Sequence, residues 1–183
     1  MALWLDTPER YGRVSRVFHW LMAALFAWQF AGALLFVSIG DTALTRAVGG
    51  SHFTLGFSLL FLVLLRGSWG LANLRHRPPH PGRRGRAAVI GHGVIYGLMI
   101  VVPILGLLNR YASGKPFASF GIPLLVERDS KIEWLMVPAN LHPWLGFTLL
   151  AVVLGHIAMS FVHRVVWHED VLSRMVPHVA RRR

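Results

Sequence analysis

The sequence contains no cysteine, and charged residues make up only 15% of its 183 positions. Soluble domains are about a quarter charged, so this chain lacks the polar surface that such a domain needs. The absence of cysteine excludes disulfides, thiolate metal sites, iron–sulfur clusters and thiol nucleophiles. Histidine remains as the side chain best suited to bind a metal, and the chain has ten histidines.

Acidic residues are also scarce, because eight Asp and Glu stand against nineteen Lys and Arg, which gives a formal net charge of +11. This charge accompanies a content of 54% hydrophobic residues. A soluble nucleic-acid binder carries its positive charge on a polar surface, so no nucleic-acid partner is expected. Disorder is excluded as well, since it requires low hydrophobicity.

Four long stretches contain no Asp, Glu, Lys or Arg. They run from Val17 to Gly40, Ala47 to Leu65, Ala87 to Asn109 and Trp134 to His163. About 20 helical residues cross a hydrocarbon core, and unbroken apolar runs of this length indicate helices rather than barrel strands. We predict an all-α fold, an integral membrane four-helix bundle forming one domain over 1–183. Its spans are expected at about 17–40, 47–65, 87–109 and 139–163.

The flanking Lys and Arg residues predict the orientation of this bundle. The segment 1–16, the loop 66–86 and the tail from Arg164 hold three, six and five of them, and the loops 41–46 and 110–133 hold one and four. The positive-inside rule therefore places both termini and the basic loop 66–86 in the cytoplasm. That loop is expected to contact anionic lipid head groups. The first span is longer than a signal-peptide core and contains Trp28 and Gln29, so we expect it to be retained.

Five histidines lie inside the apolar stretches and clear of their ends: His19, His52, His92, His142 and His156. Ionisable residues in a span are costly and mark functional sites. His142 and His156 are 14 residues apart, just under four turns, so they share a helix face about 21 Å apart along the axis. His52 and His142 both fall in the outer half and can form one pair. His19, His92 and His156 all fall near the inner face, and depth alone does not choose two of the three.

Two imidazoles from facing helices suit haem better than zinc. Zinc usually takes four ligands, whereas a porphyrin supplies four nitrogens and needs one axial ligand on each side. Small residues let helices approach such a flat group. Glycines cluster around the histidines, at Gly49, Gly50, Gly56, Gly91, Gly93, Gly97, Gly146 and Gly155. The haem would be of the b type, because covalent attachment requires cysteine. Iron with two protein ligands has no open position, so we expect outer-sphere electron transfer.

These segments resemble the bacterial cytochrome b561 family of four-helix, di-haem membrane proteins, and most closely its superoxide oxidase members. The segments are RVSRVFHWLMA around His19, GGSHFTLGFSLLFLVLLR around His52, GHGVIYGLMIVVPILGLL around His92, GKPFASFGIPLL, and LHPWLGFTLLAVVLGHIAMSFVHR followed by DVLSRMVP. Together they cover nearly the whole chain in order.

The resemblance implies two b haems, with the inner haem held by His19 and His156 and the outer haem by His52 and His142. His92 then lies near a haem or on the quinone side without being a ligand. The chain has Arg164 where the family often has a second histidine, at the cytoplasmic boundary and away from the implied ligands.

The resemblance further implies a multi-pass protein of the bacterial inner membrane that passes electrons from periplasmic superoxide to ubiquinone. In the outer loop 110–133, Arg110 and Lys115 are expected to steer the anion, alongside Arg128 and Lys131. These residues can equally be ordinary loop charges or haem propionate partners. The apolar segment GKPFASFGIPLL is expected to fold back over the outer haem or the membrane surface.

Three other functions fit the same residues. The chain can serve as a haem-bearing membrane anchor and electron carrier for a redox partner protein, such as a dehydrogenase or hydrogenase. A histidine row without haem can serve a proton or metal transporter. A purely structural membrane subunit would tolerate substitution of its histidines.

Overall fold

The structure, a computed structural model, describes residues 4–79 and 82–176 and contains four long helical spans. They are formed by α1 (Arg13–Ile39), by α2 (Ala43–Gly49) with α3 (His52–Ala72), by α4 (Gly82–Ala112), and by α5 (Glu133–Ala139) with α6 (His142–Val165). Each span is long and apolar enough to cross a membrane, with mean hydropathy between 1.8 and 2.2. The predicted helical membrane bundle is confirmed, and the helical spans extend beyond the predicted limits at every end except that of α1, which ends at Ile39.

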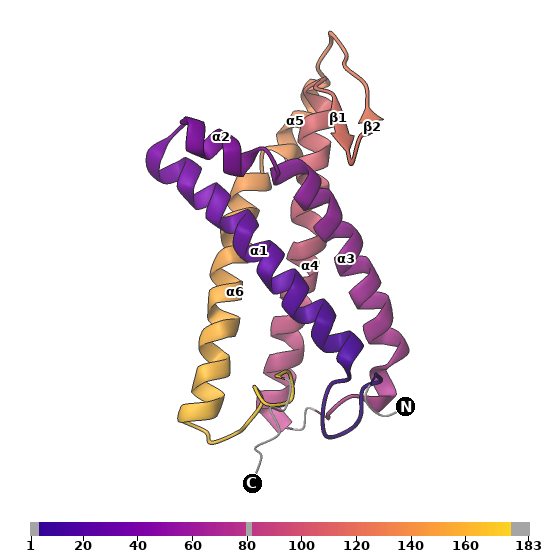
Figure 1. The fold of residues 1–183 in the computed structure, drawn as a ribbon, viewed down its shortest axis with the longest axis vertical. Coiled ribbons are helices and arrows are strands. Elements are labelled where there is room, and N and C mark those ends of the chain that lie inside the picture. The colour runs from indigo at the N-terminus through magenta and orange to yellow at the C-terminus, as the bar shows by residue number, and fades with distance from the viewer. Residues whose placement is uncertain (1–3, 80–81, 177–183) are drawn as a thin grey trace.

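The bundle has two distinct ends (Figure 1). At the hairpin end lie α2, α5 and the strands β1 (Phe117–Ser119) and β2 (Ile122–Leu125). At the terminal end, α1 and α4 begin and α3 and α6 end, with the short helix η1 (Leu74–His76) after α3. Both ends of the described chain meet here, because the Trp20 indole donates a hydrogen bond to the Met175 carbonyl (2.9 Å). The three C-terminal arginines, 181–183, lie outside the described residues.

Two of the spans are interrupted near the hairpin end. Gly40, with φ of 70°, ends α1, and Thr42 begins α2 through a reciprocal capping box with Thr45. The chain then turns at Gly50 and Ser51 before α3 starts at His52, so the predicted span 47–65 crosses a break. A second break, between α5 and α6, places His142 as the first residue of α6, just before a helix-initiating proline.

The apolar segment between α4 and α5 forms a β-hairpin. β1 and β2 pair antiparallel, with Ser119 opposite Ile122. Phe120 and Gly121 form the turn with φ values of 51° and 79°, the left-handed conformations that a tight two-residue hairpin turn requires. Phe117 is 6% exposed and packs against α3. The segment therefore folds back over the bundle end.

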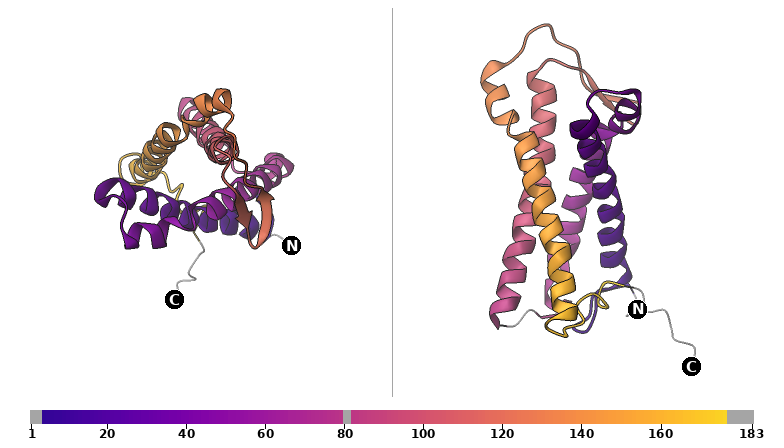
Figure 2. Two further views of the ribbon diagram at one scale, coloured as in Figure 1. Left: turned by 90° about the horizontal axis from the view of Figure 1, so that it is seen from above. Right: turned by 90° about the vertical axis from the view of Figure 1, so that its left-hand side faces the viewer.

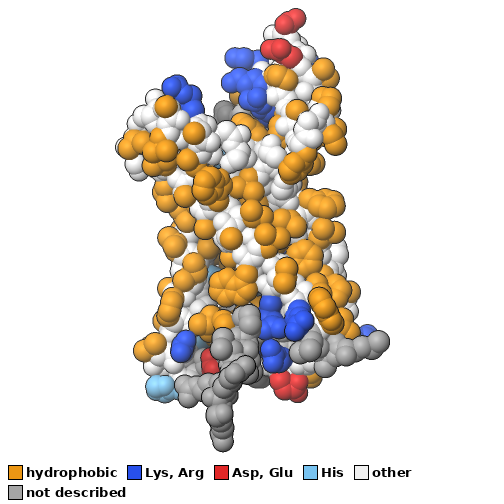
Figure 3. Space-filling view, in the orientation of Figure 1, with side chains coloured by type: hydrophobic (Ala, Val, Ile, Leu, Met, Phe, Trp, Pro, Cys, Tyr) orange, Lys and Arg blue, Asp and Glu red, His pale blue; other side chains and the backbone are white. Residues whose placement is uncertain are grey.

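The four spans pack in the order α1, α3, α4, α6 around the bundle axis (Figure 2). Their shared core is a single small layer of buried side chains: Met22, Val63, Met99, Val102 and Leu149. On the face shown in Figure 3, hydrophobic side chains cover much of the surface between the two ends, whereas Lys and Arg gather at the ends. This distribution is that of a protein whose flanks contact lipid.

Candidate functional site

The hairpin-end histidine pair consists of His52 and His142, the first residues of α3 and α6. Their ring centroids are 5.9 Å apart and their planes meet at 81°. A metal bound by one imidazole nitrogen on each side, at about 2 Å from each, separates the two centroids by roughly 6 Å. The observed spacing therefore fits two axial ligands on one metal ion.

His142 is held by the backbone of α4. Its Nδ1 atom lies 2.8 Å from the Val102 carbonyl oxygen. Because a carbonyl only accepts hydrogen bonds, Nδ1 carries the proton and donates, and Nε2 keeps its lone pair for a metal. Gly106 makes this approach possible, since a Cβ atom there would lie 2.9 Å from the His142 ring.

Aromatic side chains cover this pair from the hairpin side. The Phe53 ring lies 5.8 Å from His52 and 6.2 Å from Phe117 of β1. The Arg110 guanidinium lies 4.7 Å above the Phe53 ring, and its Nε donates to the Pro116 carbonyl (2.9 Å). Arg110 is thus held between Phe53 and the start of the hairpin segment.

Lys115 is placed differently. It follows Gly114, whose φ of 73° and contact with the Arg128 carbonyl leave no room for a side chain. Lys115 is exposed at the start of the hairpin segment. The structure therefore places Arg110 over the ring of Phe53, the residue after His52, and leaves Lys115 at the surface.

The terminal-end cluster contains the three histidines that depth could not separate. The His156 ring lies 6.5 Å from His19 and 5.1 Å from His92. All three come from different helices, α6, α1 and α4. Proximity alone leaves the choice of two ligands open here too.

Arg66 also reaches this cluster, and sequence reasoning did not select it as a site residue. Its Nη2 lies 3.3 Å from His19 Nδ1, and its guanidinium lies 5.4 Å above the Tyr96 ring. A usable signal existed, because Arg66 follows His52 by 14 residues, the same spacing that separates His142 from His156. One helix thus presents a histidine at one depth and an arginine at the other.

The packed layer separates the two histidine clusters. Leu149, 1% exposed, lies seven residues from both His142 and His156, and so about 10 Å along the axis from each.

Gly146 lies one turn after His142 on the same face, and a Cβ atom there would meet nothing within 4 Å. The space next to Gly146, one turn from His142, is therefore open.

The donor set also fits haem better than a bare metal ion. Among residues 4–79 and 82–176, no group of three or more His, Cys, Asp or Glu is arranged to hold a metal. Pairs of imidazoles are sufficient when a porphyrin supplies the other four ligands.

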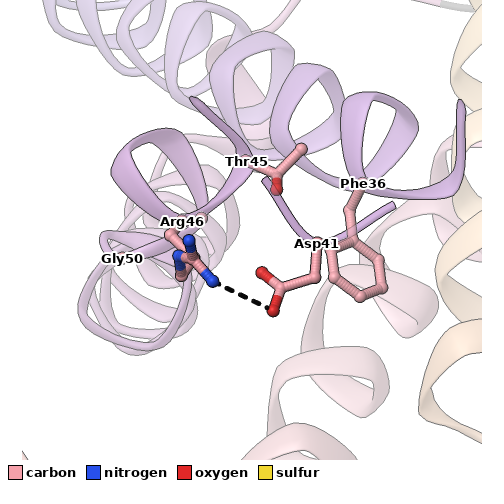
Figure 4. A pocket seen from close by; sticks show the side chains of 6 residues that line it. Phe36, Asp41, Thr45, Arg46 and Gly50 are labelled. Atoms are coloured by element: carbon pink, nitrogen blue, oxygen red, sulfur yellow. Dashed lines mark hydrogen bonds and ion pairs between the residues drawn. The ribbon is translucent and has the colours of Figure 1, made fainter. Parts of the chain in front are cut away.

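A surface pocket of about 300 Å³ lies apart from both clusters, where α1 meets α2. Phe36, Asp41, Thr45, Arg46, Gly49 and Gly50 line it (Figure 4). Its two charged side chains pair with each other, Arg46 with Asp41 at 3.2 Å, and both are exposed. The pocket has no side chain of the histidine clusters in its lining.

The segment after α6 is tied to the terminal end by Glu169. Its carboxylate accepts hydrogen bonds from His163 (2.8 Å) and from Arg84 of α4 (2.9 Å). These bonds lower the pKa of Glu169 below its usual range. The Arg84 guanidinium also lies 4.3 Å above the Trp167 ring. Nothing in the sequence pattern marked this group, since its members come from distant parts of the chain.

Known proteins are similar to this chain over nearly its whole length. Residues 10–178 match the family described as prokaryotic cytochrome b561. The chain is 30% identical over 182 residues to cytochrome b561 homolog 2 of Escherichia coli strain K12, covering 93% of both chains. It is 26% identical to the probable superoxide oxidase CybB of Yersinia pestis, covering 92% of this chain and 97% of the relative. It is 25% identical to cytochrome b561 homolog 1 of Escherichia coli strain K12, covering 92% and 98%.

Proposed function

The chain belongs to the prokaryotic cytochrome b561 family, a family of haem b membrane proteins that transfer electrons, and on that premise we propose that it is a di-haem superoxide:ubiquinone oxidoreductase of the bacterial inner membrane. The observation that carries the proposal is the pair of histidine clusters at opposite depths, separated by one packed layer. The similarity to a relative named a probable superoxide oxidase supports the choice of reaction.

Four histidines are proposed as haem ligands. His52 and His142 hold the haem at the hairpin end, and His19 and His156 hold the haem at the terminal end. His142 is already oriented for this role by the Val102 carbonyl. His92 lies beside His156 and is assigned to the surroundings of the terminal-end haem or the quinone. When bound, the two haems supply one-electron transfer from one side of the membrane toward the other.

The hairpin end is proposed to face the periplasm, with both termini in the cytoplasm. Arg110 then places a positive charge over Phe53, the residue after His52, and Lys115 adds an exposed one. Such charges raise the local concentration of an anion such as superoxide. Acidic residues of the same loop, Glu127, Asp129 and Glu133, reduce the net field.

The proposed reaction balances over two turnovers. Two superoxide anions each lose one electron and leave as dioxygen. One ubiquinone gains both electrons and two protons and becomes ubiquinol. The protein's side chains form and break no covalent bond with either substrate in this scheme.

The experiment that tests the function uses the purified full-length chain with two substrates only. Superoxide is generated enzymatically, and reduction of a short-chain ubiquinone is followed optically. We expect quinol formation that superoxide dismutase suppresses and that His142→Ala abolishes. A haem-loaded chain that reduces no quinone from superoxide would instead favour an electron carrier that needs a redox partner protein.

A further inference from the structure

Arg66 is a charged residue inside a candidate membrane span. It lies in α3, six residues before the end of the span Ala43–Ala72. Its side chain points to the terminal-end cluster, where it contacts His19 of α1 and the Tyr96 ring of α4. A cation at such a depth is costly unless an anion compensates for it.

Among residues 4–79 and 82–176, no ion pair supplies such an anion to Arg66. No Asp or Glu occurs between Asp41 and Glu127, so α3 and α4 carry none. The ion pairs of the described residues join Arg46 to Asp41, Arg77 to Asp6, and both Arg84 and His163 to Glu169. At the terminal end, the nearby carboxylates of Asp6 and Glu169 are therefore already paired.

A second arginine at this end, Arg16, also forms no ion pair among the described residues. Arg16 lies three residues before His19 and is 8% exposed. Within the described part of the chain, its buried Nε atom has no hydrogen-bond partner, and its Nη1 donates to the Val176 carbonyl at 3.4 Å. Two poorly compensated guanidinium groups in one region indicate that an anionic ligand belongs there.

The contact between Arg66 and His19 points to the same conclusion. If His19 binds iron through Nε2, its Nδ1 carries a proton and is a donor. Arg66 Nη2 is also a donor, and the two atoms are 3.3 Å apart. An acceptor shared by both donors would satisfy them, and a carboxylate offers about four acceptor sites.

We propose that Arg66 binds a propionate carboxylate of the terminal-end haem. This inference rests on the proposed function, because it requires a haem at His19 and His156. Haem b carries two propionates, which are carboxylates of the kind that α1, α3, α4 and α6 lack. Arg66 is the better placed of the two arginines, since it contacts a proposed ligand directly, whereas Arg16 is partly engaged by the segment after α6.

The test combines a change in the protein with a change in the haem. Full-length protein carrying His142→Ala, so that only the terminal-end haem is bound, is freed of haem and titrated with haem b or its dimethyl ester. Esterification is expected to weaken binding about tenfold or more, because it removes a charge-assisted hydrogen bond. With Arg66→Gln the effect of esterification should become about tenfold smaller, and Arg66→Lys should be intermediate.

Arg83→Gln is the matched control, since it removes an exposed cation at the same end. It should leave the effect of esterification unchanged. The proposal is overturned if esterification weakens haem binding equally with and without Arg66→Gln. It is also overturned if esterification does not weaken binding to the His142→Ala protein that retains Arg66. If Arg66→Gln instead loses bound anionic lipid while its response to the ester is unchanged, a lipid phosphate is the partner and the proposal is wrong.

A second readout is the midpoint potential of the terminal-end haem. A nearby cation favours the reduced iron, so Arg66→Gln should lower this potential, Arg66→Lys should lower it less, and Arg83→Gln should leave it unchanged. An unchanged potential in Arg66→Gln would contradict the proposal. If His142→Ala protein with an intact Arg66 binds no haem, the proposed function itself fails rather than this inference.

Discussion

The Nδ1 atom of His142 donates a hydrogen bond to the Val102 carbonyl oxygen across 2.8 Å. This bond joins the start of α6 to the middle of α4 and determines which imidazole nitrogen remains available. Outer contacts of this kind orient metal-binding histidines and account for part of the affinity. The hairpin-end site is therefore oriented by the backbone as well as by its two side chains.

A substitution at Gly106 tests this orientation. A Cβ atom at Gly106 would lie 2.9 Å from the His142 ring and would push it away from Val102. Gly106→Val should weaken haem binding at the hairpin end about 10- to 100-fold, the usual range for loss of an outer contact. Haem titration of the purified variant measures this effect. Gly67→Ala is the control, since its Cβ would make only an ordinary 3.9 Å contact with Tyr96; equal affinities in the two variants would contradict the assignment.

Single histidine substitutions test the ligand assignment. His52→Ala and His142→Ala should each remove one haem, and His19→Ala and His156→Ala should each remove the other, as read by optical and electron paramagnetic resonance spectra. His92→Ala should retain both. Because His92 is closer to His156 than His19 is, a lost haem in His92→Ala together with full retention in His19→Ala would reverse the terminal-end pairing.

The exposed charge of Lys115 tests electrostatic steering. Lys115→Ala should slow the reaction of superoxide with the protein about two- to tenfold at low ionic strength, and the difference should shrink as salt is added. Stopped-flow measurements at several salt concentrations give the rate of reaction with superoxide and its dependence on salt. Arg83→Ala, at the opposite end, should have no effect, and steering by Lys115 is rejected if the two variants behave alike.

Glu169 gives the terminal end a defined response to acid. Hydrogen bonds from His163 and Arg84 lower its pKa below the usual 4.5. A lowered pKa means that the contact stabilises the fold above pH 4.5 and is lost as the pH falls through the folded-state value. The segment 166–176 should then detach, which hydrogen exchange of its amides would detect. The amides of this segment should exchange faster in Glu169→Gln than in the unsubstituted protein at neutral pH. Identical exchange in the two proteins from neutral pH down to below pH 4.5 would exclude this role of Glu169.

The sequence predicted the spans and the two histidine depths because both depend on simple periodic properties. Apolar run length determines where a helix can cross lipid, and the spacing of His142 and His156 determines that they share a face. The pairing of His52 with His142 also followed from depth. Depth did not choose two ligands among His19, His92 and His156, since that choice depends on helix rotation. In the structure the His156 ring lies close to both of the others.

Other features depended on contacts between distant segments. The β-hairpin forms from a segment whose apolar residues suggested only that it folds back, and its left-handed turn at Phe120 gave little signal. The break before His52 was hidden inside an unbroken apolar run. In the sequence, Arg66 has the signature of a charge flanking a span, although its spacing from His52 matches that of the two histidines in α6.

The most direct test of the account is the ratio of haem b to protein in the purified, detergent-solubilised chain. Total haem is measured as its pyridine complex and protein by amino-acid analysis. Two pairs of imidazoles, one near each end of the bundle, predict two haems per chain. A ratio of one in fully loaded protein, or the absence of haem, would contradict the central claim.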